Sequence, residues 1–111
     1  MMQLAVFHPK ALQAIRLFLK VARYALGEAI LDLQHGARLG MPLSRPMLGV
    51  APGVCELRFR DKAGIFRASY LVKSRQGVLV FHAFEKRTPK TPAHEIEIGR
   101  KRLQEVLYDK G

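Results

Sequence analysis

Arginine side chains gather in the middle of this sequence with a spacing suited to binding phosphate. Arg58 and Arg60 alternate with apolar residues, so both would lie on one face of a strand. A short turn separates them from Arg67, which would lie across from them on an antiparallel neighbour. Guanidinium groups repel one another unless an anion lies among them, and they bind phosphate oxygens through paired hydrogen bonds. The cluster predicts a phosphodiester site, with a solvated face balanced by Glu56 and Asp61 as the alternative.

A second group of basic residues follows directly on an apolar stretch. The segment LVFHAFEKRTPKTP, residues 79–92, begins as a buried strand and ends with Lys86, Arg87 and Lys90 between prolines. If this strand pairs with the strand of Arg67, its end brings these side chains to the same edge of the sheet. The arrangement predicts a concave basic surface built from two strands and one loop. A loop that only aids solubility is the alternative.

Four further residues complete the predicted site. His82 is the obvious group in this region that titrates near neutrality, so it is a candidate for catalysis. A histidine within an apolar strand is, however, more often structural. Phe84 is either a stacking platform for a base or part of the core. Lys62 and Lys73 are expected to extend the RNA-binding surface.

The composition restricts the kinds of partner. The chain of 111 residues contains 19 Lys and Arg against 9 Asp and Glu, which gives a net charge of +10. Residues 56–90 alone carry nine basic and three acidic residues, which indicates a localised site. Nucleic acid is the expected polyanion, with an anionic membrane or an acidic protein as alternatives.

Other chemistries find no support in the sequence. Cys55 is the single cysteine, so no disulfide can form within this chain, and the four histidines have no metal-ligand spacing. The glycines are too dispersed for a phosphate-binding loop. We therefore expect no metal and no cofactor. The N-terminal region lacks a long apolar stretch, which argues against a membrane span or signal peptide and predicts a cytoplasmic location.

The elements that must position these residues follow from hydrophobic periodicity. Residues 3–7 fit a short strand, and residues 11–33 repeat apolar positions as one long helix or a hairpin of two helices does. Residues 36–53 have no such period and are interpreted as an ordered connection. A final helix is expected to begin with Thr91 as its N-cap. Three strands are expected between these parts, over 54–60, 66–73 and 78–84.

These elements predict a single domain over residues 1–111 in the α+β class. We expect a small curved antiparallel sheet with the helices on one face, packed by the N-terminal helix or helix hairpin and followed by the C-terminal helix. The strand over 78–84 is apolar on both sides, which places it inside the sheet.

The order of several short motifs resembles one known family. PGV at 52–54 is followed by ELRFR at 56–60, by GIFR at 64–67 and by HAFEKRTPKTP at 82–92. FHPKAL and LGMPLSRPM, nearer the N-terminus, fit as well. Together with the basic final helix, these segments resemble the HigB-like, phage-derived branch of the RelE toxin superfamily over most of the chain.

The resemblance implies a RelE-like fold and the toxin of a type II toxin–antitoxin pair. It implies an endoribonuclease that cuts mRNA in the ribosomal A site, through attack of a ribose 2′-hydroxyl on the adjacent phosphate. The implied partners are mRNA, the ribosome and a cognate antitoxin of the helix-turn-helix type. The alternatives are a non-catalytic nucleic-acid-binding module of the same fold, an inactive toxin or regulator, and a protein whose basic face only holds an acidic partner.

The positions that match the motifs of this family suggest a role for each basic residue. The residues that match the family pattern are candidates for catalysis, namely Arg58, Arg60, Arg67, Lys86 and Arg87. The base is open between Lys86 and His82, with assistance from ribosomal or mRNA groups as a further alternative. The residues expected to bind RNA are Lys62, Lys73, Phe84 and Lys90.

Overall fold

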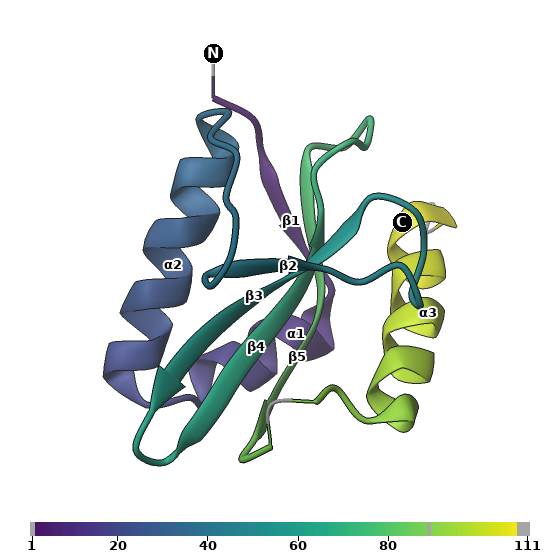
Figure 1. Cartoon of the computed structure of the whole chain (residues 1–111). Coiled ribbons are helices and arrows are strands. Elements are labelled where there is room, and N and C mark those ends of the chain that lie inside the picture. The colour runs from purple at the N-terminus through teal and green to yellow at the C-terminus, as the bar shows by residue number, and fades with distance from the viewer. Residues whose placement is uncertain (1, 89, 109–111) are drawn as a thin grey trace.

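The structure, a computed structural model, describes residues 2–88 and 90–108. Its elements follow in the order β1 (Ala5–Phe7), α1 (Pro9–Arg16), α2 (Lys20–Gln34), β2 (Ser44–Pro46), β3 (Val54–Asp61), β4 (Gly64–Leu71), β5 (Val78–Lys86) and α3 (Ala93–Tyr108) (Figure 1). The predicted α+β class is confirmed. The periodic N-terminal segment forms two helices rather than one. In the part of the chain that the structure describes, no helix is long and apolar enough to cross a membrane.

The five strands form one sheet in the order β1-β5-β4-β3-β2. β3, β4 and β5 are successive antiparallel neighbours, as predicted. β1 departs from a purely antiparallel sheet because it pairs with β5 in parallel. No hairpin joins these two strands, so the turn geometry does not fix their relative direction. β2 lies inside the segment that we interpreted as a connection and pairs with β3. Three residues are too few to show a strand period.

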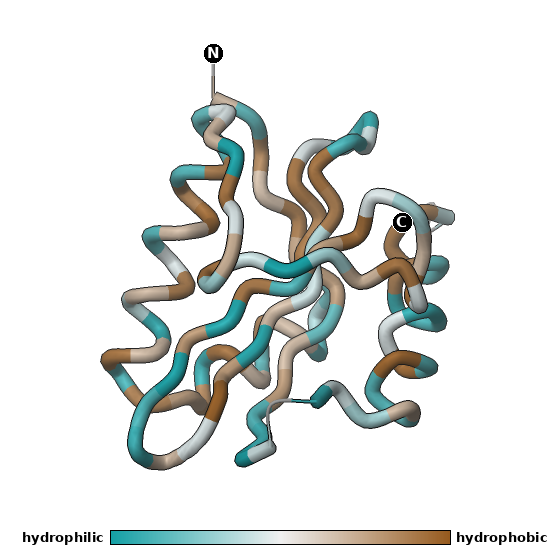
Figure 2. Tube along the Cα trace, viewed as in Figure 1, coloured by the Kyte–Doolittle hydropathy of each residue, from teal (hydrophilic) through white to brown (hydrophobic). Residues whose placement is uncertain are grey.

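The helices cover both faces of the sheet, which corrects the prediction that they share one face. α2 packs on one side in a cluster that contains Leu26 and Phe66. α3 packs on the other side, where Leu103 and Val106 join a cluster with Phe81. Figure 1 shows the two helices on opposite sides of the strands, and Figure 2 shows hydrophobic residues recurring along both. α3 therefore covers part of the face that carries the polar side chains of β3 and β4.

An irregularity in β5 decides which side chains reach the α3 face. Ser69 pairs with His82, but Tyr70 pairs with Val80, so Phe81 is an extra residue opposite β4. Such a bulge shifts the alternation of the strand by one residue. Val80 packs on the α2 side, whereas Phe81 and His82 both lie toward α3. The bulge thus places His82 on the polar face of the sheet.

Candidate nucleic-acid interface

Side chains on β3, β4 and β5 form matching rows across the polar face. In one row Arg58 pairs with Arg67, and in the next row Ile65 lies between Arg60 and Lys86. Residues paired directly across antiparallel strands project to the same face. The structure therefore brings Arg60 and Lys86 onto one face, as the sequence predicted.

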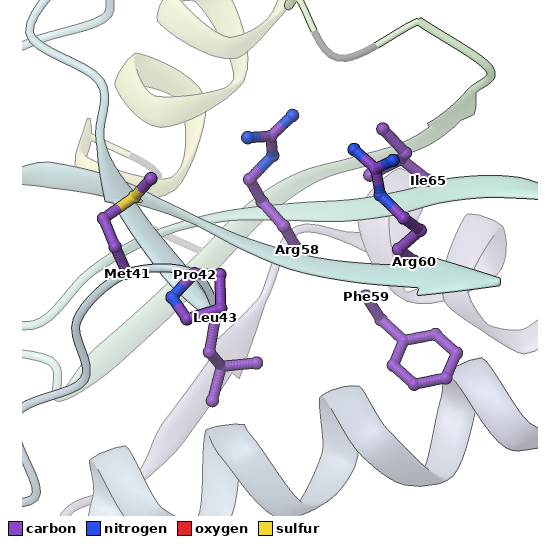
Figure 3. Close-up of a pocket in the computed structure, with 7 residues that line it drawn as sticks. All are labelled: Met41, Pro42, Leu43, Arg58, Phe59, Arg60 and Ile65. Atoms are coloured by element: carbon purple, nitrogen blue, oxygen red, sulfur yellow. The ribbon is translucent and has the colours of Figure 1, made fainter.

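Arg58 and Arg60 line a pocket beside the C-terminal end of β3 (Figure 3). The pocket has a volume of about 270 Å³. Its other lining residues are apolar, namely Met41, Pro42, Leu43, Phe59 and Ile65. Figure 3 shows the two guanidinium groups projecting to the same side of β3 and the Phe59 ring pointing the opposite way. An open apolar pocket with two guanidinium groups at its margin suits a nucleotide, because the base is flat and largely apolar and the phosphate is anionic.

Arg67 does not share this exposure. It is 0% exposed, although the sequence placed it beside Arg58 and Arg60 on an open face. Its Nη1 donates a hydrogen bond to Thr91 Oγ1 at 2.9 Å, and its Nη2 donates to the carbonyl oxygen of Thr88. Burial lowers the pKa of Arg67, and the nearby carboxylate opposes that shift. The expected exposure is therefore not observed, because the segment before α3 folds over this guanidinium.

Glu56 on β3 supplies the opposing charge and is itself fully buried. The Thr91 hydroxyl lies between the two charges, 3.2 Å from Glu56 Oε2 and 3.3 Å from Oε1. Arg58 Nε lies 3.5 Å from Glu56 Oε1. Burial raises the pKa of Glu56, and Arg67, the hydrogen bond from Thr91, Arg58 and Arg45 each act to lower it. A buried carboxylate among three arginines is thus the electrostatic centre of this face.

His82 is held in one tautomer by two side chains of α3. Arg102 Nη1 lies 2.8 Å from Nδ1, and because a guanidinium only donates, Nδ1 is the acceptor. The ring proton is therefore on Nε2, which donates to Glu95 Oε1 at 2.8 Å. Burial lowers the pKa of His82, and its hydrogen bond to Glu95 opposes that shift. Both ring nitrogens are engaged and the residue is only 3% exposed, which favours the structural alternative over catalysis.

Phe84 lies beneath the surface rather than on it. Its ring stacks on His82 with 5.1 Å between the centroids, and the Arg67 guanidinium carbon lies 5.5 Å from the ring centre. These contacts, together with its burial, support the interpretation of Phe84 as a core residue.

The remaining predicted residues fall at two ends of the sheet. We call Lys86, Arg87 and Lys90 the basic rim. Lys86 ends β5 and is half-buried, and Arg87 and Lys90 follow it and are exposed. Lys62 is exposed at the turn from β3 to β4, at the same end. Lys73 follows β4 and lies at the other end, roughly 25 Å away along this strand of eight residues. The structure does not bring Lys73 to the basic rim.

Several polar residues of this face were not recognised from the sequence as part of the site. They are Arg45, Glu56, Thr91, Glu95 and Arg102. Glu56 had a visible signal, because it alternates in phase with Arg58. Thr91 was predicted as the N-cap of α3, but the Pro92 carbonyl accepts the first helical hydrogen bonds, and the Thr91 hydroxyl is used by Glu56 and Arg67. The others depend on contacts between distant elements.

Metal-ligating side chains do not cluster on this face. Across residues 2–88 and 90–108, no group of three or more His, Cys, Asp or Glu residues is arranged to hold a metal ion.

The fold and the basic margin of its sheet define a small RelE-like α+β protein. A free-state structure of the E. coli toxin RelE, a mutant with two arginines changed to alanine, is similar with a TM-score of 0.64 and 18% identity. The match covers 96% of this chain and 100% of that chain, and it confirms the predicted RelE-like fold. The chain belongs to the family described as phage derived protein Gp49-like (DUF891), which matches residues 14–104. A search of curated proteins found no match.

Proposed function

We propose that this protein is the toxin of a type II toxin–antitoxin pair and acts as a ribosome-dependent mRNA endonuclease of the HigB-like branch. Membership of the Gp49-like family and the RelE-like fold support the toxin assignment. The observation that carries the enzymatic part is the pocket in which Arg58 and Arg60 face an apolar recess beside the basic rim. This surface fits a single-stranded nucleotide better than a duplex, because only an unpaired base can enter a pocket.

The proposed reaction needs no metal. The ribose 2′-oxygen attacks the adjacent phosphorus, the bond from phosphorus to the 5′-oxygen breaks, and a 2′,3′-cyclic phosphate and a 5′-hydroxyl form. Negative charge collects on the phosphate oxygens in the transition state, where the fixed guanidinium groups of Arg58 and Arg60 stabilise it. In this reaction we assign to Lys86 the donation of a proton to the leaving 5′-oxygen. Both nitrogens of His82 are engaged, and Lys86 is assigned to the leaving oxygen, so the proton of the 2′-hydroxyl passes to a base supplied by the ribosome or the mRNA.

Induced expression in bacteria tests this proposal. Wild-type protein should arrest growth, and a translating extract should accumulate mRNA fragments with 2′,3′-cyclic ends only when ribosomes are present. Arg60→Ala should slow cleavage by about 100-fold or more, the loss expected for one group that stabilises transition-state charge. Arg75→Ala is the matched control, because Arg75 is exposed in the connection from β4 to β5, away from this pocket. Harmless wild-type expression, or equal activity of the two variants, would contradict the proposal.

A non-catalytic RNA-binding module is the second candidate function. It is favoured by the burial of Arg67 and His82, which removes two of the six candidate catalytic groups from the surface. It predicts RNA binding that Arg60→Ala weakens, without any fragment in the translating extract.

The proposed function also requires a protein partner, the cognate antitoxin. A small antitoxin with a helix-turn-helix domain, encoded beside this chain, should abolish the growth arrest when the two are expressed together. Arrest that persists with the neighbouring reading frame would reject that frame as the antitoxin.

A further inference from the structure

We infer that Arg67 acts as a positioning residue: with Glu56 and Thr91 it forms a buried brace that holds the basic rim beside the pocket. This inference rests on the proposed function for the role of the rim. It assigns Arg67 a task that differs from contact with RNA, although its position in the sequence favoured such contact.

The brace is a continuous chain of contacts. Arg67 donates to the Thr91 hydroxyl oxygen and to the Thr88 carbonyl, and the Thr91 hydroxyl donates in turn to the Glu56 carboxylate. A hydroxyl has one proton to donate and lone pairs to accept, so Thr91 serves both charges at once. The side chains of Glu56, Arg67 and Thr91 are all buried. Such charge-assisted hydrogen bonds are stronger away from water than at the surface.

These contacts tie together segments that are distant in sequence. Glu56 belongs to β3 and Arg67 to β4, whereas Thr88 and Thr91 belong to the connection from β5 to α3. Lys86 is fixed separately, because it pairs with Ile65 in the sheet. Arg87 and Lys90 therefore lie on a short connection that is fastened at both of its ends, and their charges stay near the pocket.

The same carboxylate also contacts Arg58, which lines the pocket. Glu56 Oε1 lies 3.5 Å from Nε of Arg58, whose side chain is 14% exposed. Glu56 thus joins the brace through the Thr91 hydroxyl and also lies beside a guanidinium that lines the pocket. A phosphate that approached Arg67 would have to displace Thr91, whereas Arg58 and Arg60 line the pocket and can be reached without moving the connection. The division of roles follows from burial.

Replacing Arg67 itself is a poor test, because it would take away a positive charge that stabilises the buried Glu56 carboxylate and so risks unfolding. Thr91→Val removes only the hydroxyl and keeps the shape and the charges. Thr91→Ser restores the hydroxyl. Thr88→Val is the matched control, because it makes the same substitution in the same connection and keeps the carbonyl that Arg67 binds.

Native-state digestion with trypsin measures how often the connection opens, because trypsin cuts after Arg87 and after Lys90. Thr91→Val should raise the cleavage rate at these two bonds by about tenfold or more, because the hydrogen bonds of the hydroxyl with Arg67 and with Glu56 are both lost. Thr91→Ser and Thr88→Val should stay near the wild-type rate. Circular dichroism confirms that each variant is folded at the assay temperature, and mass spectrometry identifies the cut bonds. Equal rates for Thr91→Val and Thr88→Val would overturn the brace.

Cleavage of mRNA in the translating extract then separates this inference from the proposed function. Thr91→Val should slow cleavage, and Thr91→Ser should recover it. If Thr91→Val frees the connection without slowing an active wild-type enzyme, the positioning role is wrong and the proposed function stands. If the wild-type protein cuts no mRNA while Thr91→Val still frees the connection, the proposed function fails and the brace remains.

Discussion

At the level of single residues, burial rather than residue type divides the charges of this face. Arg58 and Arg67 are direct neighbours on adjacent strands. One lines an open pocket and the other is enclosed with Glu56 and Thr91. A guanidinium that is enclosed on all sides contributes to the position of its neighbours, whereas one that lines the pocket presents part of its surface to an anion. The same chemical group therefore serves two purposes on adjacent strands.

His82 gives a pH-dependent prediction at this scale. Burial lowers its pKa below the ordinary value of 6.5, while Glu95 raises it and Arg102 and His8 lower it further. The unfolded chain thus takes up the proton more readily, so this contribution to stability is present above pH 6.5 and is lost as the pH falls through the folded pKa. His82→Gln should flatten the fall in unfolding free energy measured by urea denaturation between about pH 7 and about pH 5.

Glu56 changes the unfolding free energy with pH in the opposite direction. The wild-type profile must therefore be compared with that of His82→Gln. Its pKa is raised above 4.5, so its contribution to stability is present at low pH and is lost as the pH rises through the folded value. The wild-type protein and His82→Gln both contain Glu56. The difference between their profiles of unfolding free energy against pH is therefore the contribution of His82. Parallel profiles would show that His82 is not the group that titrates.

At the level of elements, two glycines differ in what they allow. Gly77 has φ +117, and a Cβ there would lie 2.3 Å from the Leu4 carbonyl oxygen, next to the first hydrogen bond between β1 and β5. Gly27 lies in the interior of α2, and a Cβ there would meet nothing within 4 Å. Only the first of these glycines is required by the backbone and by close approach of another strand.

Alanine at these two positions should therefore act in opposite directions. Gly77→Ala should lower the free energy of unfolding by ~2 kcal/mol or more, through strain and the contact with Leu4. Gly27→Ala should raise it by ~0.5–1 kcal/mol, because alanine loses less backbone entropy in a helix. Urea denaturation measures both changes. A stabilising Gly77→Ala would show that β1 does not approach β5 in this way.

At the level of the whole molecule, part of the excess positive charge gathers at one end of the sheet. The net charge is +10, and the accessible basic groups near the pocket lie where β3 and β5 end and β4 begins. They comprise Arg58, Arg60, Lys62, Lys86, Arg87 and Lys90. A single-stranded RNA that neutralised all of them would release its counterions along this margin.

The salt dependence of RNA binding tests that surface. With six groups engaged, the slope of log affinity against log salt should be roughly −4, at about 0.7 per phosphate for single strands. Arg60→Ala should reduce its magnitude by about 0.7, and Arg75→Ala should leave it unchanged. Fluorescence anisotropy with a short unpaired RNA measures the slope. A slope that Arg60→Ala does not change would place the RNA elsewhere.

The sequence by itself determined the features that depend on local pattern. Alternation predicted the strands over 54–60 and 66–73 and the common face of Arg58 and Arg60, and a continuous apolar run predicted the strand over 78–84. The order of motifs predicted the RelE-like fold. The helical period could not decide between one helix and two, because residues 17–19 carry no strong breaker.

Only the tertiary structure decided which polar residues are enclosed. Alternation states which face a side chain occupies, but not what covers that face. α3 and the connection before it cover this one, and they come from the far end of the sequence. Arg67 was expected on an open face and Thr91 as a helix cap, and both are buried partners instead. The contacts that enclose His82 likewise come from α3. The physical reason is that desolvation of a charge depends on all elements that pack around it, and a single strand pattern records only one of them.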